Sequence, residues 1–345
     1  MQGDKERASH EPLMDHPFAR STPTVEKWKR LLGVVSPEDV VAILINADPD
    51  GMASAMALKR LFWRKVKRVS IYHINPIRRA DNLAFVHHLK VNQQPIRKLA
   101  PSKVTKWAIV DSQPHHNEQF FNYQFDIIID HHPVGPHTKA LFVDIKDDYG
   151  ANSTIMTEYL RAAKIKPSPR LATALFYGIK TDTDNFVRAS LANDVNAFRY
   201  LYQYANMNII KKIESSEMTR RTLASYQFAM ERVKLFKNTA FVYMEEVKDP
   251  DILVMIADFF MKLAEATWSV TAGICNGTMI VILRNAGFRG NAGRLAEKVF
   301  AHMGGTAGGH KAAARAEIPL ESVLEQAKES SEIERFLMNT LRAAM

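Results

Sequence analysis

Acidic and histidine side chains gather in four short segments that hold the residue types which bind divalent metal ions. These segments are Asn46–Gly51 with Asp48 and Asp50, then Asp111, then Asp130-His131-His132, and finally Asp182. Each follows an apolar run, although the structure of the run before Asp182 is less clear from its pattern. Ligands of open α/β sheets bind beyond the carboxyl ends of the strands. We therefore expect the four segments to meet at one edge of a sheet.

Two divalent ions would explain this combination of side chains. A pair of ions about 3.5–4 Å apart needs a bridging carboxylate, further oxygen ligands on each ion and often an imidazole. Taken singly, each aspartate is a weak signal, because an aspartate after a strand is more often a turn or helix-cap residue. Four such segments in succession are hard to explain as caps, which favours a metal centre.

The two adjacent histidines also have a simple structural explanation, since they can be surface turn residues held before Pro133. Consecutive residues that leave a strand point in different directions, however. His131 can therefore bind a metal while His132 faces a substrate phosphate.

A second set of candidates lies toward the C-terminus. Gly308 and Gly309 allow backbone N–H groups to approach an anion closely, and His310 directly after them adds a donor. Arg284, at the end of an apolar run, can contact a phosphate with two hydrogen bonds. The alternatives are a glycine-rich turn before a small-residue helix and a solvated arginine.

The elements that must position these residues predict an α/β protein with two domains. Between residues 25 and 192, short β-branched or aliphatic runs alternate with segments of helical spacing, which indicates a mostly parallel sheet flanked by helices. Residues 193–237 lack Gly and Pro and predict a helical linker. A smaller α/β domain follows at 238–320, and a closing helix at 321–345. Residues 1–24 are polar and read as a flexible leader.

Composition narrows the class of protein further. No run is long enough for a membrane-spanning helix and the first twenty residues lack an apolar signal region, so we expect a cytoplasmic protein without a membrane partner. The single Cys275 leaves neither a disulfide framework nor a cysteine zinc site. The formal charge of +9 favours an anionic partner, although a generally solvated basic surface explains it equally well.

In this order and spacing, the motifs resemble the DHH family of phosphoesterases with a C-terminal DHHA1 domain, over about residues 38–318. Asp130-His131-His132 looks like the name-giving motif, and Asp48-Pro49-Asp50-Gly51 looks like the first motif. Asp111 and Asp182 match the second and fourth motifs, and Gly308-Gly309-His310 is similar to the nucleotide-binding signature of DHHA1.

The resemblance implies two Mn²⁺ or Mg²⁺ ions in the first domain and a hydrolytic reaction in which a metal-bound water attacks phosphorus. It implies that Asp111 bridges the ions, that Asp50, His131 and Asp182 complete one site, and that Asp48 belongs to the other. It further implies that His132, Arg284, Gly308, Gly309 and His310 hold the phosphate or nucleotide. One departure is Asn46, where many relatives carry a metal-binding histidine, so either the first site is weaker or the activity is altered.

The substrate expected from this resemblance is a short oligonucleotide or a small nucleotide, as in nano-RNases that also dephosphorylate 3′-phosphoadenosine 5′-phosphate. The alternatives are cyclic-dinucleotide or single-strand exonuclease activity, and a non-catalytic nucleic-acid-binding module. The clustered carboxylates argue against the module, because they repel one another without a cation. Apolar residues on several faces of the linker helices, such as Phe198 and Ile210, leave a homodimer open.

Overall fold

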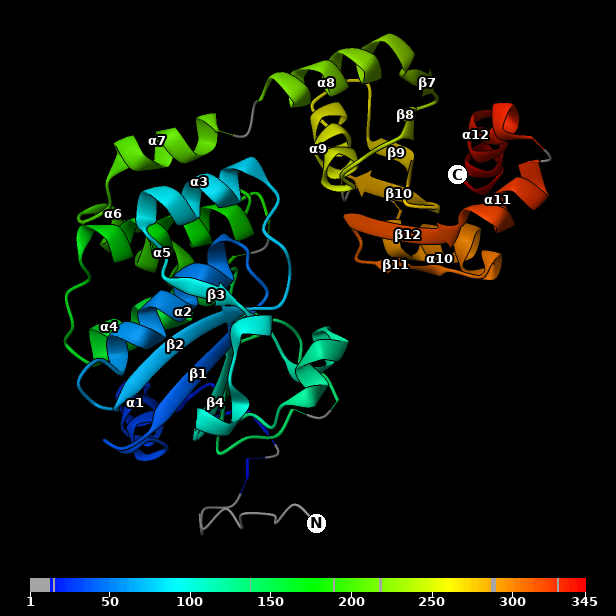
Figure 1. The fold of residues 1–345 in the computed structure, drawn as a ribbon. Helices are drawn as coiled ribbons and strands as arrows, with labels where there is room; N and C mark the ends of the chain where they lie inside the picture. Colours follow the sequence, from blue (N-terminus) through cyan, green and yellow to red (C-terminus); the bar gives the residue numbers. More distant parts are fainter. Residues whose placement is uncertain are drawn as a thin grey trace, which may run out of the picture. The chain divides into compact units, whose positions relative to one another are not determined.

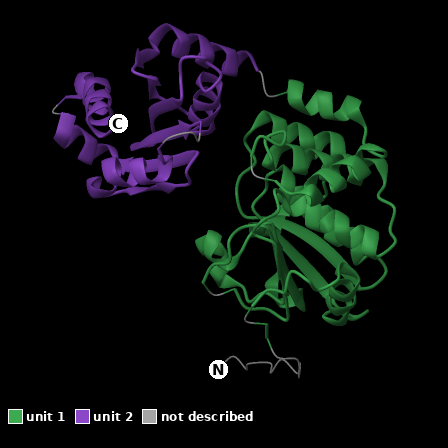
Figure 2. Cartoon of the chain, turned by 180° about the vertical axis from the view of Figure 1, so that it is seen from behind, with its two compact units in different colours: residues 1–217 green, residues 218–345 purple. Residues whose placement is uncertain are grey.

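The computed structural model describes residues 13, 14, 16–136, 138–188, 190–216, 219–286, 290–327 and 329–345 (Figure 1). The chain forms two compact units, residues 1–217 and residues 218–345 (Figure 2). The division falls inside the segment 193–237 that we predict as the linker. Most of the predicted leader, residues 1–12 and 15, lies outside the described residues.

Unit 1 is built on a sheet of six strands that all run parallel, in the order β3-β2-β1-β4-β5-β6. The strands are β1 (Val40–Ile45), β2 (Arg68–His73), β3 (Gln93–Pro95), β4 (Lys106–Val110), β5 (Ile127–Asp130) and β6 (Phe142–Ile145). Because β1 pairs with both β2 and β4, the strand order reverses between β1 and β4. The carboxyl ends of strands at such a switch point enclose the crevice in which α/β proteins bind ligands.

Alternate residues of β1 contribute to two different cores, which explains why its sequence is apolar throughout. Ile43 and Ile45 belong to the core that contains helices α2 (Pro49–Leu61), α4 (Asn152–Ala162) and α5 (Pro169–Asp182). Ala42 and Leu44 belong to a second core on the other face. Both faces of the sheet are therefore covered, as the near-continuous apolar runs predict.

The remaining helices of unit 1 are α1 (Thr24–Gly33), α3 (Ala80–Leu89), α6 (Ala192–Tyr202) and α7 (Met207–Ser215). A buried ion pair fastens α1 to the sheet: Lys27 Nζ lies 2.5 Å from Oδ1 of Asp144 in β6. Ahead of α1, Phe18 is 9% exposed and its ring packs on Phe142. The described end of the predicted leader thus packs against unit 1, because its aromatic residue finds an apolar partner there.

Unit 2 contains a mixed sheet in the order β11-β12-β10-β9-β8-β7, in which only β8 and β9 pair in parallel. Its strands are β7 (Lys234–Phe236), β8 (Thr239–Glu246), β9 (Trp268–Cys275), β10 (Thr278–Asn285), β11 (Thr306–Gly309) and β12 (Ala313–Pro319). Its helices are α8 (Arg220–Arg232), α9 (Asp251–Phe260), α10 (Ala292–Phe300), α11 (Leu320–Ala327) and α12 (Ile333–Ala344). The sheet divides the apolar residues of the unit between two cores.

The predicted fold class is confirmed: an α/β unit with a parallel sheet, linking helices and a second α/β unit. The C-terminal tail differs from the single helix that we expect, since α11 and α12 occupy it and each buries apolar residues in unit 2. Among the described residues, no helix combines the length and the apolar character that crossing a bilayer requires.

Candidate metal centre

The loop after β1 places two carboxylates at the switch point of unit 1. Asp48 is the N-cap of α2, and its Oδ1 accepts a hydrogen bond of 2.8 Å from the backbone N–H of Gly51. Asp50, in the first turn of α2, is fully buried and accepts backbone N–H bonds of 2.6 Å from Asn152 and 2.8 Å from Ser153. The start of α4 thereby holds Asp50 in one orientation.

Three further segments bring their side chains to Asp50. Asp111 follows β4, His131 follows β5, and Asp182 is the last residue of α5. One potential ligand atom from each of these four residues lies within 4.8 Å of the other three. We predicted this convergence from the sequence, except that Asp182 comes from a helix and not from the end of a strand.

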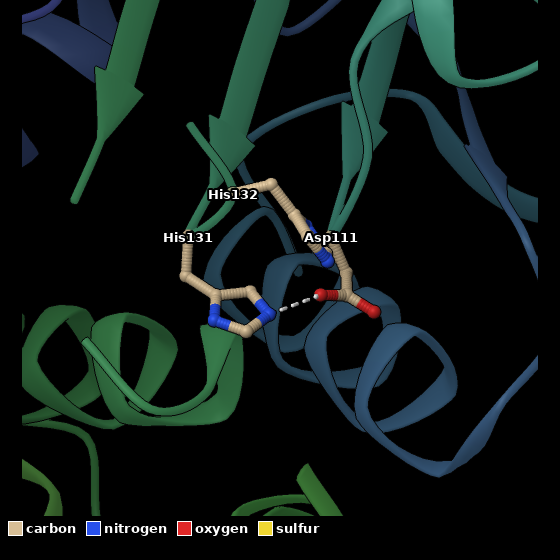
Figure 3. Close-up of side chains that lie close together, drawn as sticks. All are labelled: Asp111, His131 and His132. Carbon is tan, nitrogen blue, oxygen red and sulfur yellow. Dashed lines mark ion pairs between the residues drawn. The ribbon is translucent and has the colours of Figure 1, made fainter. Parts of the chain in front are cut away.

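His131 connects the acidic groups. Its Nε2 lies 3.3 Å from Oδ1 of Asp111 and 3.2 Å from Oδ2 of Asp182. Its other ring nitrogen, Nδ1, lies 3.1 Å from the backbone carbonyl oxygen of Tyr149. Figure 3 shows the imidazole turned toward the Asp111 carboxylate. When the imidazole is neutral, a carbonyl partner at Nδ1 selects the tautomer in which Nε2 is unprotonated, and this is the form that binds metals.

The electrostatics of the cluster favour a positive charge. Burial and, next, the neighbouring Asp182 raise the pKa of Asp48 to about 6 and that of Asp50 to about 7. Burial also raises the pKa of Asp111 well above its ordinary value. Burial alone would lower the pKa of His131, but its contacts with Asp111 and Asp182 outweigh burial and raise it to about 12. Carboxylates this close together must bind protons or cations.

The polar atoms at the centre fit a divalent cation. Within the described residues, the buried atoms Asp111 Oδ1 and His131 Nε2 have no hydrogen-bond partner of acceptable geometry. Buried polar atoms are seldom left unsatisfied in folded proteins unless an ion or a water completes them. Mn²⁺ binds both carboxylate oxygens and imidazole nitrogens, so the whole set suits it. Mg²⁺ prefers oxygen ligands and would use the carboxylates.

Two glycines let the ligands approach. A Cβ atom at Gly51 would lie 2.7 Å from the backbone oxygen of Asn46, and one at Gly178 would lie 2.9 Å from Oδ1 of Asp50. Both distances are shorter than side chains tolerate. Asp111 itself has a φ of +57°, in the left-handed region that costs most residues energy but that Asp and Asn enter more readily. Backbone strain of this kind concentrates at functional sites.

His132 also offers a ligand atom within 4.8 Å of ligand atoms of Asp111 and His131. Its side chain is 42% exposed, and its Nδ1 lies 2.9 Å from Oδ1 of the buried Asp130. The other oxygen of Asp130 accepts a 2.7 Å hydrogen bond from Nε2 of Gln113. With Asp130 ionised, Nδ1 of His132 carries the proton of this hydrogen bond, and its Nε2 takes no part in it.

The sequence pattern did not reveal this supporting network. Gln113 and His116 follow Asp111, and the ring of His116 packs edge-on against that of His132 at 5.1 Å between centroids. His116, Asp130 and His132 also offer ligand atoms within 4.8 Å of one another. Both oxygens of Asp130 already accept hydrogen bonds, so this trio serves better to position His132. The two adjacent histidines at 115 and 116 were the one feature of the sequence that pointed to this network.

Asn46, where many relatives are expected to carry histidine, lies at the rim of the cluster with its side chain exposed. The loop that carries it is held by Asn75, which lies two residues after the end of β2. The amide of Asn75 accepts from the N–H of Ala47 at 2.6 Å and donates to the carbonyl of Ala47 at 3.2 Å. Asn75 was not predicted, because no motif marks a residue that supports a loop from another segment.

In unit 2 the predicted substrate-binding residues have a different environment. Gly308 and Gly309 belong to the edge strand β11, and His310 is exposed directly after it. A Cβ atom at Gly309, whose φ is +148°, would lie 2.3 Å from the backbone oxygen of Ala313. The following small residues form strand β12 and not the helix that composition alone would favour.

Arg284 in β10 already forms hydrogen bonds within the protein. Its Nε donates a 2.6 Å hydrogen bond to Oδ1 of Asp258, and its Nη1 donates to the carbonyl of Leu283 at 3.3 Å. A contact with phosphate through two hydrogen bonds would have to replace part of this arrangement.

Comparison with known proteins assigns the class. Residues 40–179 match the DHH family, N-terminal domain, and residues 237–338 match the DHHA1 domain. The chain therefore belongs to the DHH/DHHA1 phosphoesterase superfamily.

Particular relatives add detail. An uncharacterized protein of Methanocaldococcus jannaschii is 32% identical over 300 residues, which are 87% of this chain and 61% of that protein. The chain thus matches less than two thirds of the relative's length. The crystal structure of an exopolyphosphatase-related protein from Bacteroides fragilis superposes with a TM-score of 0.73 at 13% identity, covering 94% of this chain and 98% of that one. That likeness supports the fold.

Proposed function

We propose that the protein is a metal-dependent phosphoesterase that hydrolyses short oligonucleotides or small nucleotides. The observation that carries the proposal is the convergence of Asp50, Asp111, His131 and Asp182 at the switch point of a parallel sheet. Membership of the DHH/DHHA1 superfamily supports the same reaction class.

The residues divide into three roles. Asp50, Asp111, His131 and Asp182 would hold one of two Mn²⁺ or Mg²⁺ ions, with Asp111 shared and Asp48 serving the second ion. Bound there, such ions lower the pKa of a water and neutralise charge that develops on the phosphoryl oxygens. His132, aligned by Asp130 through Nδ1, would donate a hydrogen bond from Nε2 to the substrate phosphate when both ring nitrogens carry a proton. His310, Gly308, Gly309 and Arg284 would bind the nucleotide.

The reaction is hydrolysis. A water oxygen bonds to phosphorus, the P–O bond to the departing nucleoside breaks, and the departing oxygen takes up a proton. His132 is the exposed imidazole beside the cluster, so it is the group best placed to hold the phosphoryl oxygens while that bond breaks.

The test is an assay of the full chain with Mn²⁺ against a labelled dinucleotide, 3′-phosphoadenosine 5′-phosphate, a cyclic dinucleotide, polyphosphate and a longer single strand. We expect the dinucleotide or 3′-phosphoadenosine 5′-phosphate to turn over fastest. Preference for another of these would revise the substrate class. Turnover of none, together with unchanged nucleotide binding by Asp111→Asn, would instead indicate a binding module.

A further inference from the structure

An exposed surface with an aromatic ring and several cations lies at the opposite end of α2 from Asp50. Trp63, just after the helix, is 55% exposed, although it is the largest apolar side chain of its segment. The guanidinium groups of Arg60 and Arg64 lie 5.0 and 4.4 Å from the centroid of its ring. We call Lys59, Arg60, Trp63, Arg64, Lys65 and Lys67 the Trp63 patch.

The patch carries a positive charge that the chain does not neutralise. No Asp or Glu occurs between Asp50 and Asp81. Within the described part of the chain, none of the five cations of the patch forms an ion pair. Burial lowers the pKa of Lys59, and the like charge of the neighbouring Arg68 lowers it further. These cations lack a partner of opposite charge.

Asp39, whose backbone contacts Arg68, does not serve as that partner. Asp39 precedes β1, and its backbone oxygen accepts from the N–H of Arg68. Its carboxylate, however, accepts hydrogen bonds from Ser36 and Thr105. Glu38 beside it is exposed and makes no described ion pair with the patch.

The backbone at Arg64 also indicates a fixed arrangement. Its φ is +60°, a left-handed conformation that costs a long side chain about 1 kcal/mol. In this conformation its guanidinium lies over the ring of Trp63. The positions of Lys59 and Arg60 alone could be explained by the helix dipole, because cations near the C-terminus of a helix are stabilising. Lys65 and Lys67 lie beyond the end of the helix, so the dipole does not explain them.

We propose that the Trp63 patch binds single-stranded nucleic acid, with the phosphates on its cations and an unpaired base against the indole and guanidinium planes. Cations along a backbone path combined with an exposed aromatic ring are the elements that bind single strands without sequence preference. An acidic protein or an anionic membrane would use the charge but would not need an exposed indole with guanidinium groups beside its ring.

The patch is separate from the candidate metal centre. Helix α2 has 13 residues, so its two ends lie roughly 20 Å apart at about 1.5 Å per residue. A dinucleotide at the carboxyl end of β1 cannot reach the patch over that distance. The surface would therefore hold a longer strand or anchor the protein on one, and the inference does not depend on the proposed hydrolysis.

Trp63 itself provides the signal for the test. The other three tryptophans are buried or half-buried, so quenching by an added strand reports mainly on Trp63. The full chain is titrated with a 12-nucleotide oligouridylate in EDTA, which prevents cleavage, and anisotropy of a labelled strand is recorded in parallel. We expect quenching and binding in the wild type, and affinity about fivefold weaker or more in Trp63→Ala.

Matched variants separate stacking from general charge. Arg64→Ala with Lys65→Ala should weaken binding and reduce its salt dependence. Lys211→Ala with Lys212→Ala removes the same charge from the exposed face of α7 and should bind nearly as the wild type does. Dinucleotide hydrolysis should be unchanged in all of them. Unaltered binding by Trp63→Ala, equal losses in both double variants, or equal quenching by polyglutamate or anionic vesicles would each overturn the assignment.

Discussion

The polar groups at the two sheets differ in whether they have partners within the protein. At the edge of the parallel sheet in unit 1, carboxylates from separate segments are buried together, and buried atoms of Asp111 and His131 lack hydrogen-bond partners among the described residues. In unit 2, Arg284 is bonded to Asp258 and His310 is exposed to solvent. The first arrangement needs added protons or a cation, whereas in the second Arg284 already has a partner of opposite charge.

The largest effect on the cluster of unit 1 is expected for Asp111→Asn. Asparagine tolerates the left-handed backbone of this position, so the change removes charge with little strain. We expect phosphoesterase activity to fall about 1,000-fold, as when a group that stabilises the transition state is removed. The rate with the best substrate in Mn²⁺ measures it.

The same variant gives an independent readout of the cluster. Because Asp111 is buried among like charges, its neutralisation should leave the free energy of unfolding in EDTA unchanged or higher. The increase in Tm on adding Mn²⁺ should become much smaller. A variant that is strongly destabilised in EDTA would show that Asp111 is a structural residue.

A buried charge with a partner in unit 1 should behave in the opposite way. Asp144→Asn leaves Lys27 buried without its counter-ion, and Tyr159 loses a charged acceptor at 2.7 Å. We expect the free energy of unfolding to fall by about 3–5 kcal/mol in urea titrations. Asp147→Asn, which breaks the exposed pair with Arg20, should cost less than about 1 kcal/mol. Similar losses in both variants would contradict the distinction.

The pH dependence of stability tests the electrostatics of the metal centre. The pKa of Asp50 is raised to about 7 and that of Asp48 to about 6, from the ordinary 3.8. The folded protein then holds protons that the unfolded chain releases between about pH 4 and pH 7, so stability contributed by these groups is lost as the pH rises. In EDTA we expect a loss of more than about 1 kcal/mol across this window.

Metal should reverse this trend, because ligands bind it in their deprotonated form. The stabilisation by Mn²⁺, taken as the difference between urea titrations with Mn²⁺ and with EDTA at each pH, should grow from pH 5 to pH 7. A difference that stays constant with pH would argue against protons and metal sharing these carboxylates.

The contribution of unit 2 should be to binding. His310→Ala removes an exposed donor without creating a cavity, so we expect KM to rise about tenfold while kcat stays within a factor of two or so. His302→Ala, at another exposed histidine of unit 2, is the control and should change neither constant. A large fall in kcat for His310→Ala would mean that unit 2 takes part in the chemistry.

The sequence could predict a strand or a site residue where the local pattern of residues determines its structure. It could not do so where pairing with a distant segment determines that structure. The runs that became β1, β4 and β5 are apolar throughout, and the residues after them were expected at one sheet edge, where they lie. Strand β12 was not predicted, because Ala313 and Ala314 favour a helix until pairing with β10 and β11 decides their structure. Asp182 was expected near the cluster, but its place at the end of α5 was not foreseen.

The supporting residues escaped prediction for a related reason. Gln113 acts on Asp130 and Asn75 acts on Ala47, and each bond crosses from one segment to another. No periodicity or spacing marks such a pair. Motifs therefore identify side chains that meet a ligand more readily than those that hold them in place.

The smallest effect concerns the rim of the metal centre, where Asn46→His restores the imidazole that many relatives are expected to carry. The Asn46 side chain is exposed and makes no described hydrogen bond, so a larger ring can be accommodated there without breaking a contact. Imidazole binds Mn²⁺ better than a neutral amide oxygen does, so calorimetry should show an affinity several-fold, about tenfold at most, tighter. Asn196→His, at an exposed asparagine of α6, should leave the affinity unchanged. Unchanged or weaker affinity in Asn46→His would place residue 46 outside the metal centre and leave Asp48 without an imidazole partner in the second site.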